Sequence, residues 1–193
     1  MLSIDVLGYA AQCDPVNGGI SRVWVFDPAD IDWTQVTPGD VYTACALAAG
    51  ATTAAGGGFR EIKFDYLEGE YKAPFTRKNS SVKYNHALTL HLPQISQDMT
   101  KFLETLQKAA ACASLGFVFQ LNTGKVLVMG ESIVNGDKIV QFRVLLDDGT
   151  EVGSGKMLDD SQGATVVFKG DYVRPLYEYT GGVSTIEALL AEV

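Results

Sequence analysis

Histidine and cysteine side chains are the ones in this sequence that could bind a metal ion or act as a nucleophile, and both types are scarce. His86 and His91 lie five residues apart in a segment whose apolar residues alternate, so they are expected on opposite faces of a strand and cannot share a metal ion. His86 lies among leucine and tyrosine residues and is predicted to be a packed, hydrogen-bonded core residue, whereas His91 is expected on the solvated face. Cys13, Cys45 and Cys112 are odd in number and far apart, which favours neither a disulfide framework nor a metal site.

Acidic turns and glycine runs offer the next candidate chemistry, because hard cations prefer several carboxylates and phosphates prefer glycine-rich loops. Residues 147–149 and 159–163 are acidic, but neither run has the alternating acidic positions or the terminal glutamate of a calcium loop. The glycine run at 56–58 lacks the following helix and the lysine or serine that would hold a phosphate. No HExxH, GxSxG or GxxxxGK[ST] motif occurs. We therefore expect a protein that is not an enzyme and that has no cofactor and no metal.

The charge balance is acidic, with 23 Asp and Glu against 15 Lys and Arg and a net charge of −8. Affinity for phosphates comes mainly from clustered Lys and Arg, so tight nucleic-acid binding is not expected. The same charge would keep DNA from sticking to a surface that it passes, although it also suits simple solubility. The amino-terminal residues lack a basic region, and no stretch of eighteen consecutive apolar residues occurs. A soluble, unsecreted protein is expected.

Period-two alternation and turn residues predict a mainly β chain. The clearest pattern covers residues 82–92, where apolar and polar side chains alternate over the whole segment. Gly124 is placed for the left-handed position of a short hairpin loop. In contrast, residues 48–58 are almost all small and are expected to be a flexible loop or to order only against a neighbour. Further strands are expected at 20–26, 41–47, 59–65, 117–121, 125–129, 139–146, from 151 onward, and at 164–169 and 172–179.

Two helices complete the prediction. Ser96 can cap a helix over 96–114 that has apolar residues at helical spacing and is stopped by Gly116. After Gly181 and Gly182, the segment 184–187 has the pattern of a capping box that opens a short helix. The expected fold is a β-barrel or sandwich with one packed helix over residues 1–180, followed by a linker and short helix over 181–193.

Two segments are candidates for contacts between subunits. Residues 66–81 form a polar loop or hairpin that is long for a plain connection and carries aromatic and basic side chains. The tail has apolar residues on one helical face, and so short a helix is marginal in water unless that face is buried. Its own domain and a neighbouring subunit are the two alternatives for the surface that buries it. The candidate interface residues are Tyr71, Phe75, Arg77, Lys78, Ile186, Leu189 and Leu190.

Several segments resemble the tail tube proteins of tailed phages. Residues 18–25 (GGISRVWV) resemble the strand that follows a Gly-Gly turn in that family. Residues 122–130 (NTGKVLVMG) resemble its hairpin and apolar strand, and residues 160–170 (DSQGATVVFKG) are similar to its late strand. The order of strand, long loop, long strand and helix also fits, so the resemblance covers most of residues 18–170.

The resemblance implies a structural virion protein of the tail, assembled in the host cytoplasm, whose copies form stacked hexameric rings. DNA would pass down the lumen as cargo without specific binding, and other tail proteins would be partners; type VI secretion tubes share this fold. The chain departs from the pattern at 131–156 and after Pro175, which leaves a neck or tail-completion subunit open. A small-molecule-binding β-barrel is the alternative from another class, and an enzyme comes third.

Overall fold

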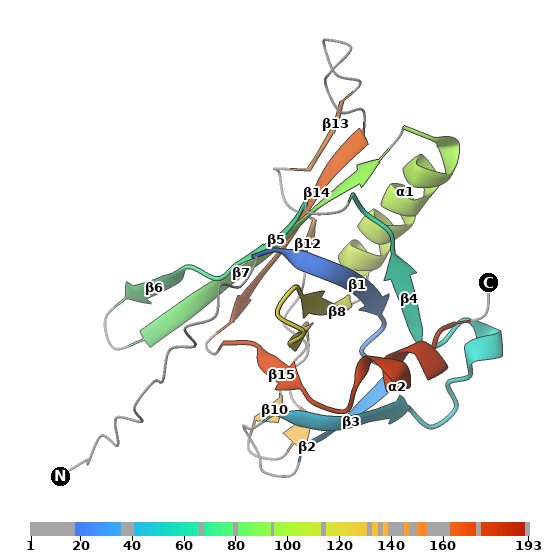
Figure 1. The fold of residues 1–193 in the computed structure, drawn as a ribbon, viewed down its shortest axis with the longest axis vertical. Helices are drawn as coiled ribbons and strands as arrows, with labels where there is room; N and C mark the ends of the chain where they lie inside the picture. Colours follow the sequence, from blue (N-terminus) through green and yellow to red (C-terminus); the bar gives the residue numbers. More distant parts are fainter. Residues whose placement is uncertain are drawn as a thin grey trace.

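The computed structural model describes residues 18–35, 41–65, 68–78, 81–93, 95–112, 115–130, 133–134, 137–138, 145–146, 150–153, 163–172 and 175–191. Within these residues the chain is mainly β and has two large sheets (Figure 1). The first sheet has the order β2-β3-β15-β9-β8-β1-β4. Its strands are β1 (Ile20–Phe26), β2 (Ile31–Gln35), β3 (Tyr42–Leu47), β4 (Phe59–Ile62), β8 (Gly116–Leu121), β9 (Val126–Met129) and β15 (Tyr177–Tyr179).

The second sheet is built around one long strand and has the order β12-β14-β7-β5, with β13 also paired to β14 and β6 to β7. Its strands are β5 (Gly69–Lys72), β6 (Phe75–Lys78), β7 (Ser81–Pro93), β12 (Leu145–Leu146), β13 (Glu151–Gly153) and β14 (Gly163–Tyr172). A separate small hairpin pairs β10 (Ile133–Val134) with β11 (Asp137–Lys138). The helices are α1 (Gln97–Cys112), α2 (Val183–Ala188) and a 3₁₀ turn, η1 (Thr53–Ala55).

The first sheet is buried on both faces. In β1, Val23 and Val25 join the core that the two sheets share with α1, whereas Trp24 and Phe26 join a second core on the opposite face. Such a strand reads as a continuous apolar run, because alternation disappears when both faces leave water. The sequence of β1, ISRVWVF, ends in such an apolar run, which agrees with its place in a sheet that is buried on both faces.

The first sheet curves until its two ends approach each other, but it does not close. Among the described strands its hydrogen-bonded order ends at β2 and at β4. Aromatic rings fill the gap, since the ring centroids of Trp33 on β2 and Phe59 on β4 lie 6.0 Å apart. The barrel half of the barrel-or-sandwich prediction is therefore corrected to two sheets without a closed barrel in the described part of the chain.

The segment from α2 onward bridges the open side of this sheet. The Phe59 N–H donates to the Leu189 carbonyl at 3.0 Å, and the Ala191 N–H donates to the Phe59 carbonyl at 2.9 Å. Gly58 permits this approach, because a Cβ atom there would lie 2.3 Å from the Leu189 carbonyl oxygen. The tail is thus hydrogen-bonded to β4 of its own chain.

The strand and helix with the strongest patterns are confirmed. β7 pairs with β14 over ten registered positions, and its inward residues Leu88 and Leu90 are buried. α1 packs Met99 and Leu106 into the same core, and the Met99 N–H donates to Ser96 Oγ at 3.1 Å, as a cap at Ser96 predicts.

Other expectations need correction. β2 was missed, because its polar Asp32 and Thr34 and the turn signals around it hide the alternation of Ile31 and Trp33, which are buried. Residues 48–58 are not a plain flexible loop, since they contain η1 and are tied by their own backbone hydrogen bonds. The expected break between strands at 164–169 and 172–179 lies later, because β14 runs to Tyr172. Residues 139–144 lie outside the described residues.

Candidate functional site

The main candidate is a hairpin arm made of residues 75–78 of β6 and residues 81–84 of β7. Among the described strands, β6 pairs only with this first part of β7, in a register that sets Phe75 opposite Tyr84 and Arg77 opposite Val82. The arm extends to one side of the molecule, away from α1 and β4 (Figure 1). Phe75 is 69% exposed and Val82 is 37% exposed. The described residues of the segment 66–81 include β5 and β6, and the pairing of β6 with β7 agrees with the hairpin alternative of the prediction.

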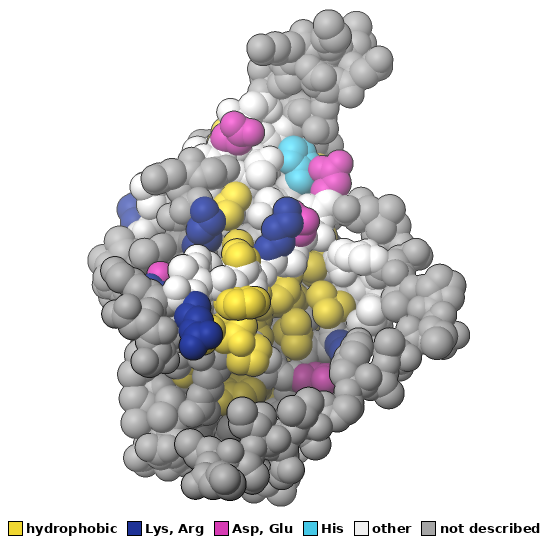
Figure 2. All heavy atoms as spheres, turned by 90° about the vertical axis from the view of Figure 1, so that its left-hand side faces the viewer, with side chains coloured by type: hydrophobic (Ala, Val, Ile, Leu, Met, Phe, Trp, Pro, Cys, Tyr) yellow, Lys and Arg dark blue, Asp and Glu magenta, His cyan; other side chains and the backbone are white. Residues whose placement is uncertain are grey.

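The exposed face of the arm is the continuation of a core face. Paired residues share one face of a sheet, and alternate residues of β7 do so too, so Phe75, Val82 and Tyr84 lie on the face that holds Leu88 and Leu90. That face is fully buried at Leu88 and becomes exposed towards Val82. Viewed from the side on which the arm ends, hydrophobic side chains gather between basic ones (Figure 2). The arm thus presents an apolar sheet face that the other described elements of its own domain leave exposed.

Tyr71, which the sequence analysis named as a candidate interface residue, is partly buried rather than exposed. Its hydroxyl lies 2.7 Å from His86 Nδ1, and its ring centroid lies 5.0 Å from that of Phe119. Burial raises the pKa of the Tyr71 phenol, because the phenolate would lose its hydration. Tyr71 is therefore a partly buried packing residue of its own chain, and its role as an interface anchor stays a prediction. His86 is buried and hydrogen-bonded, as predicted.

Of the remaining candidates on the arm, Arg77 is exposed and has no ion-pair partner among the described residues. The backbone of Lys78 ends β6, while its side chain lies outside the described part of the structure. The candidate interface on the arm therefore rests on Phe75 and Arg77, with Val82 and Tyr84 added from β7.

The three tail candidates are used within the chain. Ile186 is 0% exposed in the second core, and Leu189 and Leu190 pack against the same cluster. Ile186 is thus already buried by its own domain, which contradicts its expected docking on a neighbour, whereas Leu189 and Leu190 are partly buried and their contact with a neighbour stays a prediction. The expected capping box is also absent: α2 has no side-chain cap, and the Glu187 carboxylate accepts from Arg22 Nη1 at 2.5 Å.

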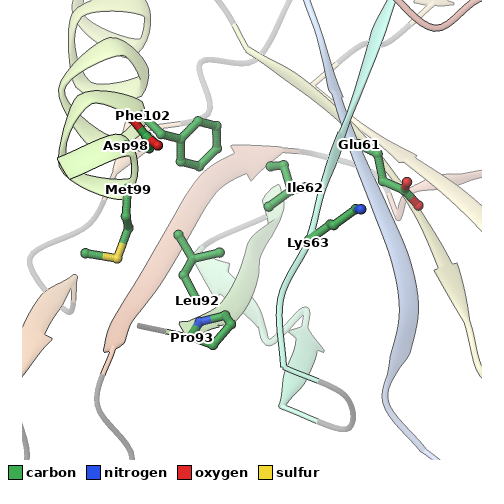
Figure 3. A pocket seen from close by; sticks show the side chains of 8 residues that line it. All are labelled: Glu61, Ile62, Lys63, Leu92, Pro93, Asp98, Met99 and Phe102. Atoms are coloured by element: carbon green, nitrogen blue, oxygen red, sulfur yellow. The ribbon is translucent and has the colours of Figure 1, made fainter. Parts of the chain in front are cut away.

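A second feature is an apolar groove between β4, the end of β7 and the first turn of α1 (Figure 3). It encloses about 420 Å³. The α1 side of the groove is formed by Asp98, Met99 and Phe102 (Figure 3). The end of β7 contributes Leu92 and Pro93, and the end of β4 with the residue that follows it contributes Ile62 and Lys63. The lining residues are Glu61, Ile62, Lys63, Leu92, Pro93, Asp98, Met99 and Phe102.

The charges at the rim of this groove are not equivalent. Glu61 already accepts from Arg22 Nε at 2.8 Å, whereas Asp98 is exposed and has no ion-pair partner among the described residues. Lys63 is exposed on the β4 side of the groove, opposite the helix (Figure 3). The groove therefore offers one free carboxylate on its α1 side and one ammonium group on its β4 side.

One group of side chains in the described residues has the composition of a metal site. Ligand atoms of Asp65, Glu68 and His91 lie within 4.8 Å of one another. His91 Nε2 is 3.7 Å from Asp65, and His91 Nδ1 is 4.0 Å from Glu68 and 3.3 Å from Thr165 Oγ1. The His91 side chain is only 14% exposed, so its expected place on a solvated face is corrected. The Glu68 N–H donates to the Asp65 carbonyl at 3.1 Å, which holds the two acidic residues near each other, and no local sequence signal indicates their contact with His91.

Cys45 is a free cysteine, and its side chain is buried. Its Sγ lies 3.4 Å from the Tyr179 hydroxyl, and burial raises the pKa of the thiol. The arrangement favours an unreactive packing cysteine. Cys13, the acidic turn at 147–149 and most of 159–163 lie outside the described residues, as does the side chain of Cys112.

None of the helices in the described ranges is long and apolar enough to cross a membrane. Comparison with known proteins adds no family: no protein-family model, no curated protein and no solved structure matches this chain.

Proposed function

We propose that this chain is a structural subunit that assembles with copies of itself, and that it forms stacked hexameric rings of the kind found in phage tail tubes. The observation that carries the proposal is the hairpin arm, on which a face that is buried in the body continues into solvent. Isolated soluble domains rarely expose an ordered, contiguous apolar face, and aromatic or arginine anchors are the residues that interfaces favour. Phe75 and Arg77 are such anchors.

The resemblance supplies the geometry of the assembly. The motifs at 18–25 and 122–130 correspond to β1, to the turn at Gly124 and to β9, which are neighbours through β8 in the first sheet. Gly124 has φ +85°, as the hairpin motif requires. A two-sheet domain with a helix packed on it is also the form that the resemblance implies. These agreements support the proposal, and the ring number comes from the resemblance alone.

The small-molecule-binding barrel is less well supported. A barrel of that type needs a hollow interior. In the described residues, the interior of the curved first sheet is filled by large side chains that are fully buried. The ring of Trp33, for example, has its centroid within about 6 Å of those of three other rings, which belong to Phe26, Tyr42 and Tyr179.

Native mass spectrometry and negative-stain microscopy of the purified chain over a range of concentrations test the proposal. Rings, short stacks or a concentration-dependent polymer are expected. A monomer at every concentration, together with the absence of this chain from any virion or tube in a lysate, would refute self-assembly. Rings that never stack would instead support a neck or tail-completion subunit.

A further inference from the structure

We propose that the hairpin arm of one copy docks into the apolar groove of the next copy, with Phe75 over the groove floor and Arg77 paired with Asp98. The inference rests on the proposed self-assembly, and it names the surface that receives the arm. Both surfaces belong to the described part of the chain, and each has an apolar centre with an unpaired charge beside it.

The arm carries the required pair of groups at a fixed spacing. Phe75 and Arg77 are alternate residues of β6, so they project from the same face, about 6.6 Å apart along the strand. Arg77 has no ion-pair partner among the described residues, whereas the neighbouring Lys83 is paired with Asp171 and Lys72 with Glu70. Among the basic side chains of the arm that the structure describes, Arg77 is thus the one that remains available to a partner.

The groove offers the complementary pair. Its volume of about 420 Å³ lies in the range of about 300–1,000 Å³ that is typical of small-molecule pockets, so a phenyl ring fits. Met99, Phe102 and Leu92 supply apolar surface, and Asp98 projects from the first turn of α1 at the same rim (Figure 3). Because Lys63 lies on the β4 side, Arg77 is repelled there and attracted to the α1 side. The charges therefore define one orientation of the arm.

The positions of the two surfaces favour a neighbouring copy as the occupant. The arm lies at the beginning of β7, whereas Leu92 and Pro93 at the far end of this strand line the groove, so the arm cannot fill the groove of its own chain. The arm also extends away from α1 and β4, which contribute the other lining residues (Figure 1). A donor and an acceptor placed in this way make a head-to-tail contact, which continues from copy to copy and closes into a ring or grows as a filament. Such a contact suits a subunit that assembles into rings or stacks.

A charge exchange tests the pairing. Sedimentation velocity of the full chain over a concentration series gives the concentration at half-assembly for the wild type, Arg77→Glu, Asp98→Arg and the double variant. Each single variant should raise this concentration by about tenfold, and the double variant should return it to within about threefold of the wild type. Glu104→Arg, an exposed change on the same helix, is the matched control and should have little effect. Circular dichroism should show that all variants fold.

The apolar half of the contact is tested by Phe75→Ser, with Val152→Ser as its control, because Val152 is also exposed but lies on β13. Loss of assembly in the first variant alone is expected. If the wild type assembles and Asp98→Arg or Phe75→Ser assembles equally well, docking in the groove is refuted while self-assembly stands. Failure of the double variant to recover also refutes the pairing. A wild type that stays monomeric at every concentration and is absent from virions and tubes in a lysate refutes both the docking and the proposed function itself. Stoichiometric binding of an apolar dye that Asp98→Arg abolishes, with assembly unchanged, assigns the groove to a small ligand instead.

Discussion

Replacing Ile186 with alanine should destabilise the folded monomer strongly. Ile186 is 0% exposed and lies in the second core together with Phe59 and Tyr179. The change removes three carbon groups, each worth about 0.8 kcal/mol of transfer free energy, which is about 2.4 kcal/mol. Buried Ile-to-Ala changes cost about 2–5 kcal/mol once the cavity is included. We therefore expect the free energy of unfolding to fall by about 3–4 kcal/mol.

Urea unfolding followed by circular dichroism and tryptophan fluorescence measures this loss, since Trp24 and Trp33 belong to the same core. The midpoint should move while the slope of free energy against urea stays constant. Ile186→Val should cost about 0.5–1.5 kcal/mol, which gives a graded series. Val152→Ala, at an exposed position, should change stability by less than about 0.5 kcal/mol.

The same variant separates the two accounts of the tail. If Ile186 packs on its own domain, deletion of residues from 184 onward should also unfold or strongly destabilise the monomer. A loss of less than about 1 kcal/mol in Ile186→Ala, combined with impaired assembly, would refute the intramolecular packing. It would restore the expectation that this helix docks on a neighbour.

Three further predictions concern buried polar groups. Tyr71→Phe should lower the free energy of unfolding by about 1–3 kcal/mol, because His86 loses its hydrogen-bond partner at Nδ1, and it should leave assembly unchanged; weaker assembly at equal stability would return Tyr71 to the interface. The Cys45 thiol should resist alkylation in the native protein and react at once in urea, since burial raises its pKa; rapid native labelling at Cys45, located by mass spectrometry of peptides, would contradict its burial. Burial raises the pKa of Tyr179 to about 12, so the folded state holds this proton more tightly than the unfolded chain, whose tyrosines titrate near the ordinary value of about 10. Stability should therefore decline as pH rises from about 10 towards about 12, and the decline should be smaller in Tyr179→Phe; identical pH profiles for the two proteins would count against this cause.

The metal-type cluster of Asp65, Glu68 and His91 is distinct in its side chains from the residues that line the groove. It joins Asp65 and Glu68 to β7 and β14, since the Asp65 N–H donates to the His91 carbonyl at 2.9 Å and His91 lies against Thr165. In the described residues the cluster thus links these two acidic residues to the second sheet. The two surfaces used in the docking proposal involve none of its side chains.

Local patterns in the sequence determined the elements whose signals lie within a few residues. The alternation over 82–92 predicts β7, the capped 3.6-residue period predicts α1, and the turn at Gly124 predicts the β8–β9 hairpin. His86 was also placed in the core from its strand face alone. Such signals suffice because side-chain periodicity and turn geometry are properties of neighbouring residues.

The tertiary structure decided what depends on residues far apart in the chain. β2 is a strand because Trp33 packs against rings of β1, β3 and β15, and its own polar residues obscure that role. The tail is internal because Phe59, more than a hundred residues earlier, offers it both hydrogen bonds and apolar surface. The groove beside Asp98 exists only where β4, β7 and α1 meet. Contacts of this kind are set by how the sheets curve and pack, which no short stretch of sequence encodes.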